Sequence, residues 1–200
     1  IIQEALPRFD ARLLEIQRPV YLSGFWQCDR YFGDQADAIR GELTLRTPIP
    51  ECYQGVRREI ESSESVGLVV RRGDYLGIPN TQGICTLEYY RRALAIITAT
   101  VPQRRVFVFS DDIPWCQENL ALEEKTVFVP NESPERPEEH LRILSGCRYF
   151  ILANSSYAWW GAWLSTHRGK IVIGPSKWMQ DADQLGDLLP QQWMQIPNKQ

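Results

Sequence analysis

The second part of the chain, from Val66 onward, alternates short apolar runs with amphipathic segments. Five runs are rich in β-branched and aromatic residues, as buried strands are, and they cover residues 66–70, 106–109, 126–129, 149–152 and 171–173. Apolar residues at helical spacing separate most of them, at residues 86–97, 114–120, 138–147 and 156–164. Strands that alternate with helices predict an α/β fold with a doubly wound parallel sheet covered on both faces.

Residues 1–65 follow a different pattern. Residues 29–43 predict an amphipathic helix, because their apolar positions recur at spacings of three and four. The polar stretch 61–65 has the composition of a connector. We therefore expect two units, a smaller and mainly helical N-terminal segment at 1–65 and an α/β domain at 66–200.

The composition narrows the class of protein. The 200 residues carry 22 basic and 25 acidic side chains, and the net charge of -3 provides no field that would attract nucleic acid. No stretch approaches the run of about 20 apolar residues that crosses a bilayer. The five cysteines are widely spaced without a CxxC pair, which argues against a zinc knuckle or a disulfide scaffold. We expect a bacterial cytoplasmic protein, with membrane association only through a segment outside this sequence.

The first strand end carries a candidate anion site. Ligands of open parallel sheets bind at the carboxyl ends of the strands, and Arg71, Arg72 and Gly73 follow the first run. Two guanidiniums beside a glycine suit a phosphate or diphosphate, because arginine binds oxyanions through paired N–H groups. A surface turn in which one arginine pairs with Asp74 explains the same residues. The Arg-Gly-Asp tripeptide is too short to indicate adhesion.

Two further strand ends carry polar residues that a helix cap also explains. After the second run, Ser110 or Asp111 can cap a helix while Asp112 complements the helix dipole, or one carboxylate can accept hydrogen bonds from a ligand. After the fourth run, residues 154–156 can form an anion cradle from hydroxyls and helix N–H groups, or an ordinary cap. The tryptophan-rich run 159–163 favours core packing over a sugar platform.

The sequence gives little indication of a metal site or of a catalytic triad. No histidine or third acid follows the Asp111–Asp112 pair at ligand spacing, so we expect no metal site. The two histidines, His140 and His167, form no Ser-His-Asp or Cys-His arrangement that spacing supports. Walker and GxGxxG loops are absent from the sequence.

Three segments occur together in an order that is more specific than any one of them. VVRRGDY at 69–75, FSDDIPWCQENL at 109–120 and FILANSSYAWWGAWL at 150–164 resemble the hallmark segments of the α-1,2-fucosyltransferases, glycosyltransferase family 11. Residues 21–43 and 171–179 resemble the middle region and the closing strand of that family.

The resemblance implies a GT-B-like architecture whose C-terminal Rossmann-like lobe, residues 66–200, binds GDP-fucose. It implies transfer of fucose to the 2-hydroxyl of a terminal β-galactoside glycan, with inversion at the anomeric carbon and without a metal or another cofactor. The family's glycine-rich N-terminal segment has no counterpart in this sequence. We therefore expect a member truncated at its N-terminus, with residues 1–65 as the remnant of the acceptor-side region.

Residue by residue, the resemblance assigns Arg71 to the β-phosphate of the donor, with Arg72 in support, and places residues 154–156 near the diphosphate. Asp74 is our candidate for the general base that takes the proton of the acceptor hydroxyl, so we expect Asp74 and Arg71 to be catalytic. The complete set expected on GDP-fucose is Arg71, Arg72, Tyr75, Asp111, Asp112, His140, Asn154, Ser155 and Ser156.

Two positions depart from the family pattern. Val69 stands where the pattern HxRRGDY has histidine, and His140 stands where an aspartate is frequent before the third segment. If the missing histidine contacts the donor in the family, its absence here lowers affinity or turnover. The alternative to an active enzyme is a catalytically impaired nucleotide-sugar-binding or regulatory module of the same family.

Overall fold

The chain folds around one parallel sheet of six strands in the order β5-β4-β3-β6-β7-β8. The structure is a computed structural model that describes residues 1–4, 8–77, 85–120, 122, 125–131, 136–179 and 186–198, without the side chain of Asp74. The strands are β3 (Glu64–Val70), β4 (Arg104–Ser110), β5 (Val127–Phe128), β6 (Tyr149–Ile151), β7 (Val172–Pro175) and β8 (Met194–Ile196). The predicted α/β class and parallel sheet are confirmed. β8 was not predicted, because it is short and largely exposed.

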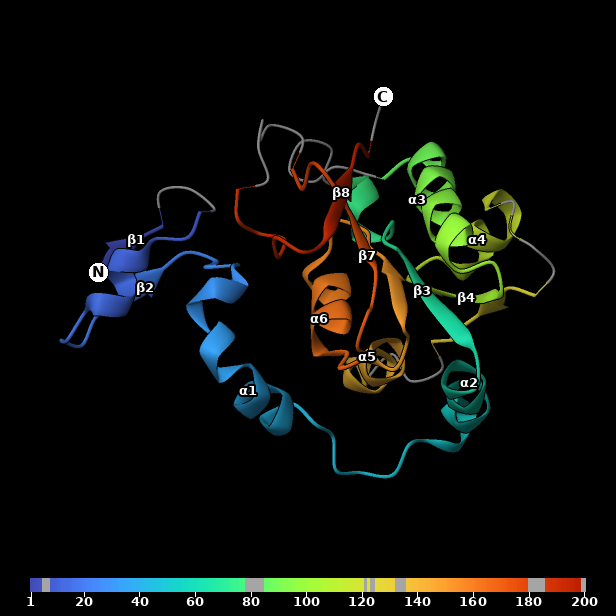
Figure 1. Ribbon diagram of the computed structural model, residues 1–200, viewed down its shortest axis with the longest axis horizontal. Coiled ribbons are helices and arrows are strands. Elements are labelled where there is room, and N and C mark those ends of the chain that lie inside the picture. Colours follow the sequence, from blue (N-terminus) through green and yellow to red (C-terminus); the bar gives the residue numbers. More distant parts are fainter. Residues whose placement is uncertain are drawn as a thin grey trace.

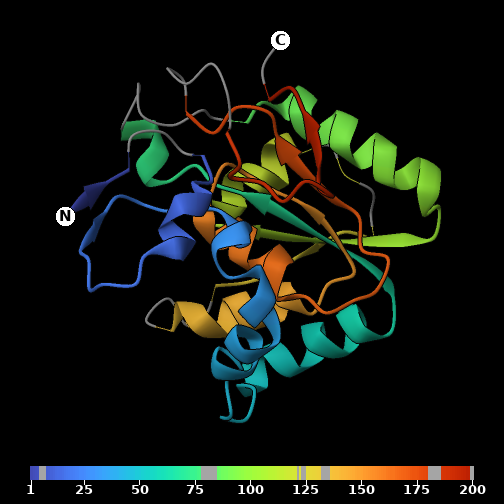
Figure 2. The same ribbon diagram turned by 60° about the vertical axis from the view of Figure 1, so that its left-hand side comes forward.

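Helices cover both faces of this sheet (Figure 2). They are α2 (Glu51–Glu61), α3 (Leu87–Thr100), α4 (Ile113–Asn119), α5 (Pro137–Ser145) and α6 (Ser156–Leu164). Successive side chains of a strand point to opposite faces. Leu68 and Val70 of β3 therefore join a core with α3 and α4, while Val69 joins a second core with α2, α5 and α6. This double burial explains why β3 reads as a continuous apolar run.

Small residues let α5 approach its neighbours. A Cβ added to Gly67 of β3 would lie 2.7 Å from Leu144 Cδ1 of α5, so a larger residue would displace that leucine. Gly161 of α6 also faces Leu144. The close approach that Gly161 allows is therefore between α6 and α5. This packing fixes α5, whose first turn borders the carboxyl edge of the sheet.

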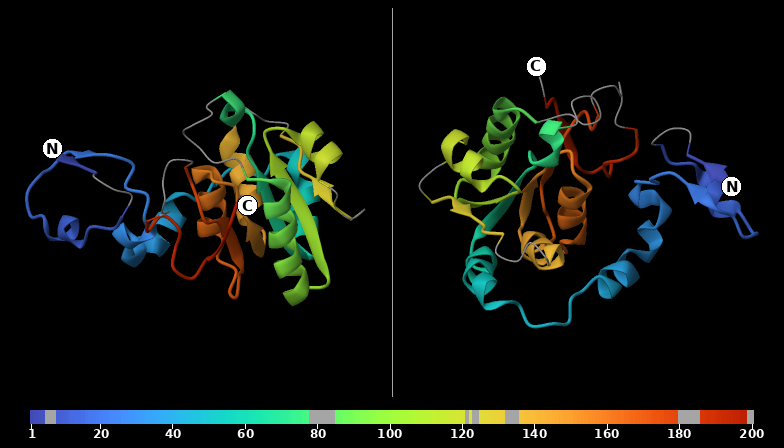
Figure 3. Two further views of the ribbon diagram at one scale, coloured as in Figure 1. Left: turned by 90° about the horizontal axis from the view of Figure 1, so that it is seen from above. Right: turned by 180° about the vertical axis from the view of Figure 1, so that it is seen from behind.

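The N-terminal segment begins apart from the six-stranded sheet (Figures 1 and 3). It contains β1 (Ile2–Gln3), η1 (Ala11–Glu15), β2 (Leu22–Ser23), η2 (Asp29–Tyr31), η3 (Gly33–Gln35) and α1 (Ala36–Glu42). The single helix predicted over 29–43 is wrong, because Phe32 leaves the helical conformation with φ -142° and ψ 14°. Its ring stacks on Trp160 at 5.9 Å between centroids, so contact with α6 is associated with this break.

The helix α2 was not predicted from the sequence, although it carries buried side chains. Tyr53 and Ile60 of α2 belong to the same core cluster as Val69 of β3. The last residues of the predicted connector, Glu64 and Ser65, are the first residues of β3. The helices that cover the sheet therefore begin with α2, before the boundary expected at residue 65. The division of the chain at that residue stays a prediction.

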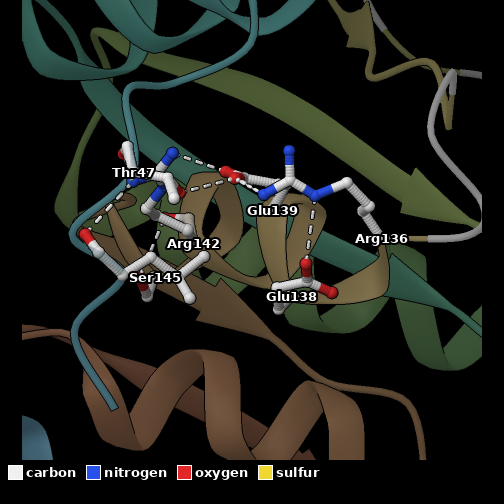
Figure 4. Close-up of polar contacts among 7 residues, drawn as sticks. Thr47, Arg136, Glu138, Glu139, Arg142 and Ser145 are labelled. Carbon is white, nitrogen blue, oxygen red and sulfur yellow. Dashed lines mark hydrogen bonds and ion pairs between the residues drawn. The ribbon is translucent and has the colours of Figure 1, made fainter. Parts of the chain in front are cut away.

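An ion-pair cluster around one buried carboxylate holds the strap that links α1 to α2, residues 43–50 (Figure 4). Glu139 is fully buried and accepts from Arg136 Nη2 at 2.6 Å and from Arg142 Nη2 at 2.5 Å. Arg142 Nη1 also donates to the carbonyls of Leu45 at 3.3 Å and Thr47 at 2.8 Å. We call Thr47, Arg136, Glu139 and Arg142 the Glu139 cluster. It fastens the strap across α5.

Candidate donor site at the carboxyl edge of the sheet

The site lies where the strand order reverses. From β3 the chain adds β4 and β5 on one side and then returns to place β6, β7 and β8 on the other. The strand ends on either side of such a reversal form a crevice, which is where open α/β sheets bind ligands. A pocket of about 150 Å³ opens there, and its wall includes four of the residues expected on the donor: Arg71, Asp111, His140 and Ser155.

A larger hollow of about 930 Å³ lies elsewhere, between the strap and the helices α5 and α6. Two residues that line it lie where helices lead into strands. Gly146 follows α5 and precedes β6, and Leu164 ends α6 and precedes β7, so the hollow borders the amino ends of the strands. None of the described residues expected on the donor lines this hollow. Its position, away from the crevice of the reversed strand order, argues against it as the nucleotide site.

Arg71 follows β3 and reaches the pocket wall. Its Nη1 lies 3.1 Å from Asp111 Oδ2, and its guanidinium lies 5.4 Å from the ring centroid of Tyr75. The side chain remains 37% exposed, so its guanidinium is accessible to an incoming anion. Asp111 and Tyr75 thus orient a cation at the mouth of the pocket.

Arg72 points away from the pocket toward α4. Its guanidinium lies 3.7 Å from the ring centroid of Trp115, and its Nε lies 3.4 Å from Asp112 Oδ2. Its backbone N–H donates to Asp111 Oδ1 at 2.9 Å. Arg72 therefore ties the end of β3 to the end of β4, and its support for Arg71 is through the placement of Asp111.

Gly73 allows the Asp111 carboxylate to come close to the backbone. A Cβ at this position would lie 2.6 Å from Asp111 Oδ2. The glycine beside the two arginines thus gives room to a neighbouring carboxylate. The alternative in which an arginine pairs with Asp74 lies outside the described side chains, and so does the candidate general base Asp74.

Asp112 serves as the N-cap of α4. Its Oδ1 accepts from Trp115 N–H at 3.1 Å, while its own N–H donates to Ser110 Oγ at 2.9 Å. The expectation that Ser110 or Asp111 caps this helix is wrong by one or two residues, because the helix starts at Ile113. The cap frees Asp111 to face the pocket.

The polar residues of the turn between β6 and α6 have different roles: one lines the pocket and another holds the turn in place. Ser155 is buried at the N-cap position of α6 and lines the pocket, whereas Ser156 is exposed and lies outside its wall. Asn154 donates to the Trp178 carbonyl at 2.9 Å, and Tyr75 donates to the Asn154 carbonyl at 3.1 Å. Asn154 and Tyr75 thus hold the turn that presents Ser155 and the N-terminus of α6.

A neutral polar pair occupies another part of the pocket wall. His140 Nδ1 lies 3.0 Å from the Tyr157 hydroxyl, and its ring meets Phe109 edge-on with 5.0 Å between centroids. Burial lowers the pKa of His140 to about 4, and the Val129 backbone partly opposes that shift. Burial also raises the pKa of Tyr157, to which Tyr53 contributes. Both side chains are therefore uncharged near neutral pH.

Tyr157 and Asn131 also line the pocket, although the sequence did not predict them there. Asn131 follows β5, so the rule that polar residues after strands face the ligand would have found it. Tyr157 carried no such signal, because it reads as part of the apolar helix α6. The two departures from the family pattern, Val69 and His140, line this same pocket.

The tryptophans of α6 serve mainly the core, as expected. Trp159 and Trp163 are buried, and Trp159 Nε1 donates to the Leu188 carbonyl at 2.9 Å. Within the described residues, no group of three or more His, Cys, Asp or Glu side chains is placed to hold a metal ion. No described helix combines the length and the apolar character needed to span a bilayer. The metal-independent mechanism and the membrane association stay predictions.

Comparison with known proteins identifies one family over nearly the whole chain. The model of glycosyl transferase family 11 matches residues 4–196. An alpha-1,2-colitosyltransferase of Escherichia coli is 31% identical over 181 residues, covering 86% of this chain and 61% of that protein.

Two other relatives match shorter segments. The O-antigen biosynthesis glycosyltransferase WbnK of Escherichia coli is 36% identical over 121 residues, covering 59% of this chain and 40% of that protein. A galactoside alpha-(1,2)-fucosyltransferase 1 of Lagothrix lagotricha is 29% identical over 155 residues, covering 72% of this chain and 42% of that protein. The chain thus spans between 40% and 61% of the length of these relatives.

Proposed function

The chain belongs to glycosyltransferase family 11, and we propose that it transfers fucose from GDP-fucose to the 2-hydroxyl of a terminal β-galactoside, with inversion and without a metal. One observation carries this proposal. Arg71 and Ser155, which comes just before α6, line one pocket at the reversal of the strand order. A relative whose name gives galactoside alpha-(1,2)-fucosyltransferase activity supports the choice of donor and acceptor.

The two sides of the pocket suit a diphosphate. The guanidinium of Arg71 supplies paired N–H donors and a permanent charge. The first N–H groups of α6, together with the positive end of its dipole, supply a second anion-binding element. Asp111 holds the guanidinium in place before the ligand arrives, and such preorganisation is what gives electrostatic stabilisation its strength.

These groups would act on the leaving group. The bond between the anomeric carbon of fucose and the β-phosphate oxygen breaks, and its electron pair leaves with GDP. Arg71 and the α6 N-terminus stabilise the negative charge that develops on the phosphate. The acceptor 2-hydroxyl forms the new bond from the opposite face, and its proton passes to a base, for which we propose Asp74.

Protection by the nucleotide tests the donor site. GDP at 100 times its dissociation constant should raise the free energy of unfolding by about 2.7 kcal/mol. Guanosine, which has no phosphate for Arg71 or α6, should protect much less at the same concentration. Thermal unfolding monitored by circular dichroism measures both. Equal protection by the two compounds, or none by millimolar GDP, would contradict the proposal.

The second candidate is a nucleotide-sugar-binding or regulatory module without transfer activity. Val69 and His140 favour it, because both replace residues of the family pattern inside the pocket. This candidate also predicts protection by GDP, so transfer decides between the two. Formation of an α-1,2-linked fucosyl product from GDP-fucose and lactose would eliminate the module, whereas GDP binding without any product would favour it.

A further inference from the structure

The two groups proposed to bind the diphosphate come from different segments of the chain. Arg71 follows β3, whereas Ser155 and the N-terminus of α6 follow β6. A diphosphate has a definite length, so both groups bind it together at low cost only when their separation is already fixed. A residue that connects the two segments would therefore influence donor binding without contacting the donor.

Tyr75 contacts both segments. Its ring centroid lies 5.4 Å from the guanidinium carbon of Arg71, within the range of a cation–π contact. Its hydroxyl donates to the carbonyl oxygen of Asn154 at 3.1 Å, and this hydrogen bond is buried. A carbonyl oxygen can only accept, so the direction of the bond is fixed. One side chain thus joins the cation after β3 to the turn that precedes α6.

Both partners of Tyr75 are also held by neighbouring strand ends. Arg71 pairs with Asp111 Oδ2, which follows β4, at 3.1 Å. Asn154 Nδ2 donates to the carbonyl of Trp178, which follows β7, at 2.9 Å. A continuous series of contacts therefore runs along the carboxyl edge of the sheet, and Tyr75 lies at its middle.

The surroundings of Tyr75 favour a place behind the binding surface. The family resemblance leads us to expect this residue on GDP-fucose, yet it is only 9% exposed. Among the described residues, those that line the pocket include Arg71 and Ser155 but not Tyr75. Its hydroxyl hydrogen is already given to Asn154. These observations support an indirect role for Tyr75 in donor binding.

We propose that Tyr75 is a positioning residue that keeps Arg71 and the N-terminus of α6 at a fixed separation, so that both bind the diphosphate together. This inference rests on the proposed function and deepens it, because it names the residue through which the two anion-binding elements act jointly. Without the hydroxyl, the turn before α6 loses its link to the segment after β3. The ligand must then order the two elements itself, which weakens binding.

Titration calorimetry with GDP and guanosine tests the hydroxyl, because the ratio of the two affinities isolates the contribution of the phosphates. Tyr75→Phe keeps the ring beside Arg71 and removes the bond to Asn154. It should lower this ratio about threefold to tenfold, as for the loss of one hydrogen bond. The affinity for guanosine should stay close to that of wild type, because guanosine has no phosphate for either element.

Tyr89→Phe is the matched control. Tyr89 is fully buried, and its hydroxyl donates to the carbonyl of Leu152 at 2.6 Å, close to Asn154 in the sequence. The bond has the same chemistry and reaches the same segment, but Tyr89 belongs to α3 and to the core on that face of the sheet. Tyr89→Phe should lower the stability of the protein and leave the ratio unchanged.

A double-mutant cycle separates positioning from direct contact. Arg71→Ala removes one of the two elements, so a residue that fixes their separation has little left to contribute. The free-energy loss of GDP binding in the double variant should therefore be smaller than the sum of the losses in Tyr75→Phe and Arg71→Ala. A hydroxyl that contacts the donor itself would give the same loss in both backgrounds.

A label carries the test if Tyr75→Phe does not fold. 3-Fluorotyrosine at position 75 keeps both the ring and the hydroxyl, and its fluorine NMR signal reports on the guanidinium beside it. Saturating GDP should shift this signal and guanosine should not. The same label at position 89 should show no shift with either compound.

The outcomes separate the inference from the function. An unchanged ratio in a folded Tyr75→Phe, an equal fall of the ratio in Tyr89→Phe, or additive losses in the cycle overturns the role of Tyr75. A fluorine signal at position 75 that GDP leaves unchanged does the same. Wild-type protein that binds GDP no better than guanosine overturns the proposed function, and this inference with it.

Discussion

Two groups of arginines and carboxylates, the Glu139 cluster and the pairs at the strand ends, differ in the burial of their carboxylates. In the Glu139 cluster the carboxylate is fully buried and receives hydrogen bonds from two guanidiniums. At the strand ends, Arg71 pairs with Asp111 and Arg72 with Asp112, and these four side chains keep between 19% and 37% of their surface exposed.

This difference in burial indicates which group has a structural role and which group can bind a ligand. A carboxylate that is buried between two arginines is satisfied by them and holds segments together, as Glu139 holds the strap. A partly exposed pair beside a pocket can exchange its partner for a ligand at a smaller cost in desolvation. The same residue types thus serve two purposes, and the surroundings decide which one.

Replacing Glu139 should lower the stability of the protein more than any other change considered below. Glu139→Ala leaves Arg136 and Arg142 without their buried partner, and should lower the free energy of unfolding by about 3–5 kcal/mol. The neighbouring Glu138 is 44% exposed and pairs with Arg136 at 3.2 Å. Glu138→Ala should therefore cost no more than about 1 kcal/mol. Urea unfolding measures both, and similar losses would remove the distinction between the two groups.

Acid should act on the pocket residue His140. The pKa of His140 is about 4 in the folded protein and about 6.5 when unfolded, so the unfolded chain binds the proton first as the pH falls. The stability that the neutral ring preserves is complete above pH 6.5 and decreases by about 2 kcal/mol by pH 5.

The acid effect is measured as the difference between wild type and His140→Gln, which cannot titrate there. The ionisable groups around the imidazole are Tyr53 of α2, Tyr157 of α6, and Arg71 and Asp111 in the pocket wall. These remain in both proteins, so their own titration cancels to first order. Parallel stability curves between pH 7 and pH 5 would show that His140 is not buried as described.

A smaller effect is expected at the strand ends. Asp112→Ala removes the N-cap of α4 and the exposed pair with Arg72, and should cost about 1 kcal/mol. Asp112→Asn keeps the capping oxygen and should recover most of the loss. A destabilisation as large as that of Glu139→Ala would place this carboxylate with the structural group instead.

The sequence predicted the strand ends better than the packing around them. Arg71, Asp111 and Ser155 could be found because each follows an apolar run, and parallel strands bring their carboxyl ends to one edge. Glu139 and Tyr157 could not be found in this way. Each depends on contacts with a distant segment, the strap for Glu139 and α5 for Tyr157, and no local pattern reports such contacts.

Local pattern also failed where tertiary contacts change a helix. Residues 29–43 have helical spacing, yet the helix breaks at Phe32, which packs on the tryptophans of α6. The opposite error occurred at α2, whose apolar residues Tyr53, Val56 and Ile60 have helical spacing that was passed over. The cap of α4 was misplaced because three consecutive residues, Ser110 to Asp112, can each cap a helix.

The affinity of GDP for two arginine variants tests whether the strand-end pocket binds the diphosphate. Arg71→Ala removes the accessible cation of the pocket, and Arg105→Ala removes an arginine that is 40% exposed near the start of β4. Titration calorimetry should find GDP binding weakened about 10-fold to 100-fold by Arg71→Ala, as for loss of a charged hydrogen bond, and unchanged by Arg105→Ala. Equal affinities for wild type and Arg71→Ala, or an equal loss in both variants, would contradict the claim that the strand-end pocket binds the diphosphate.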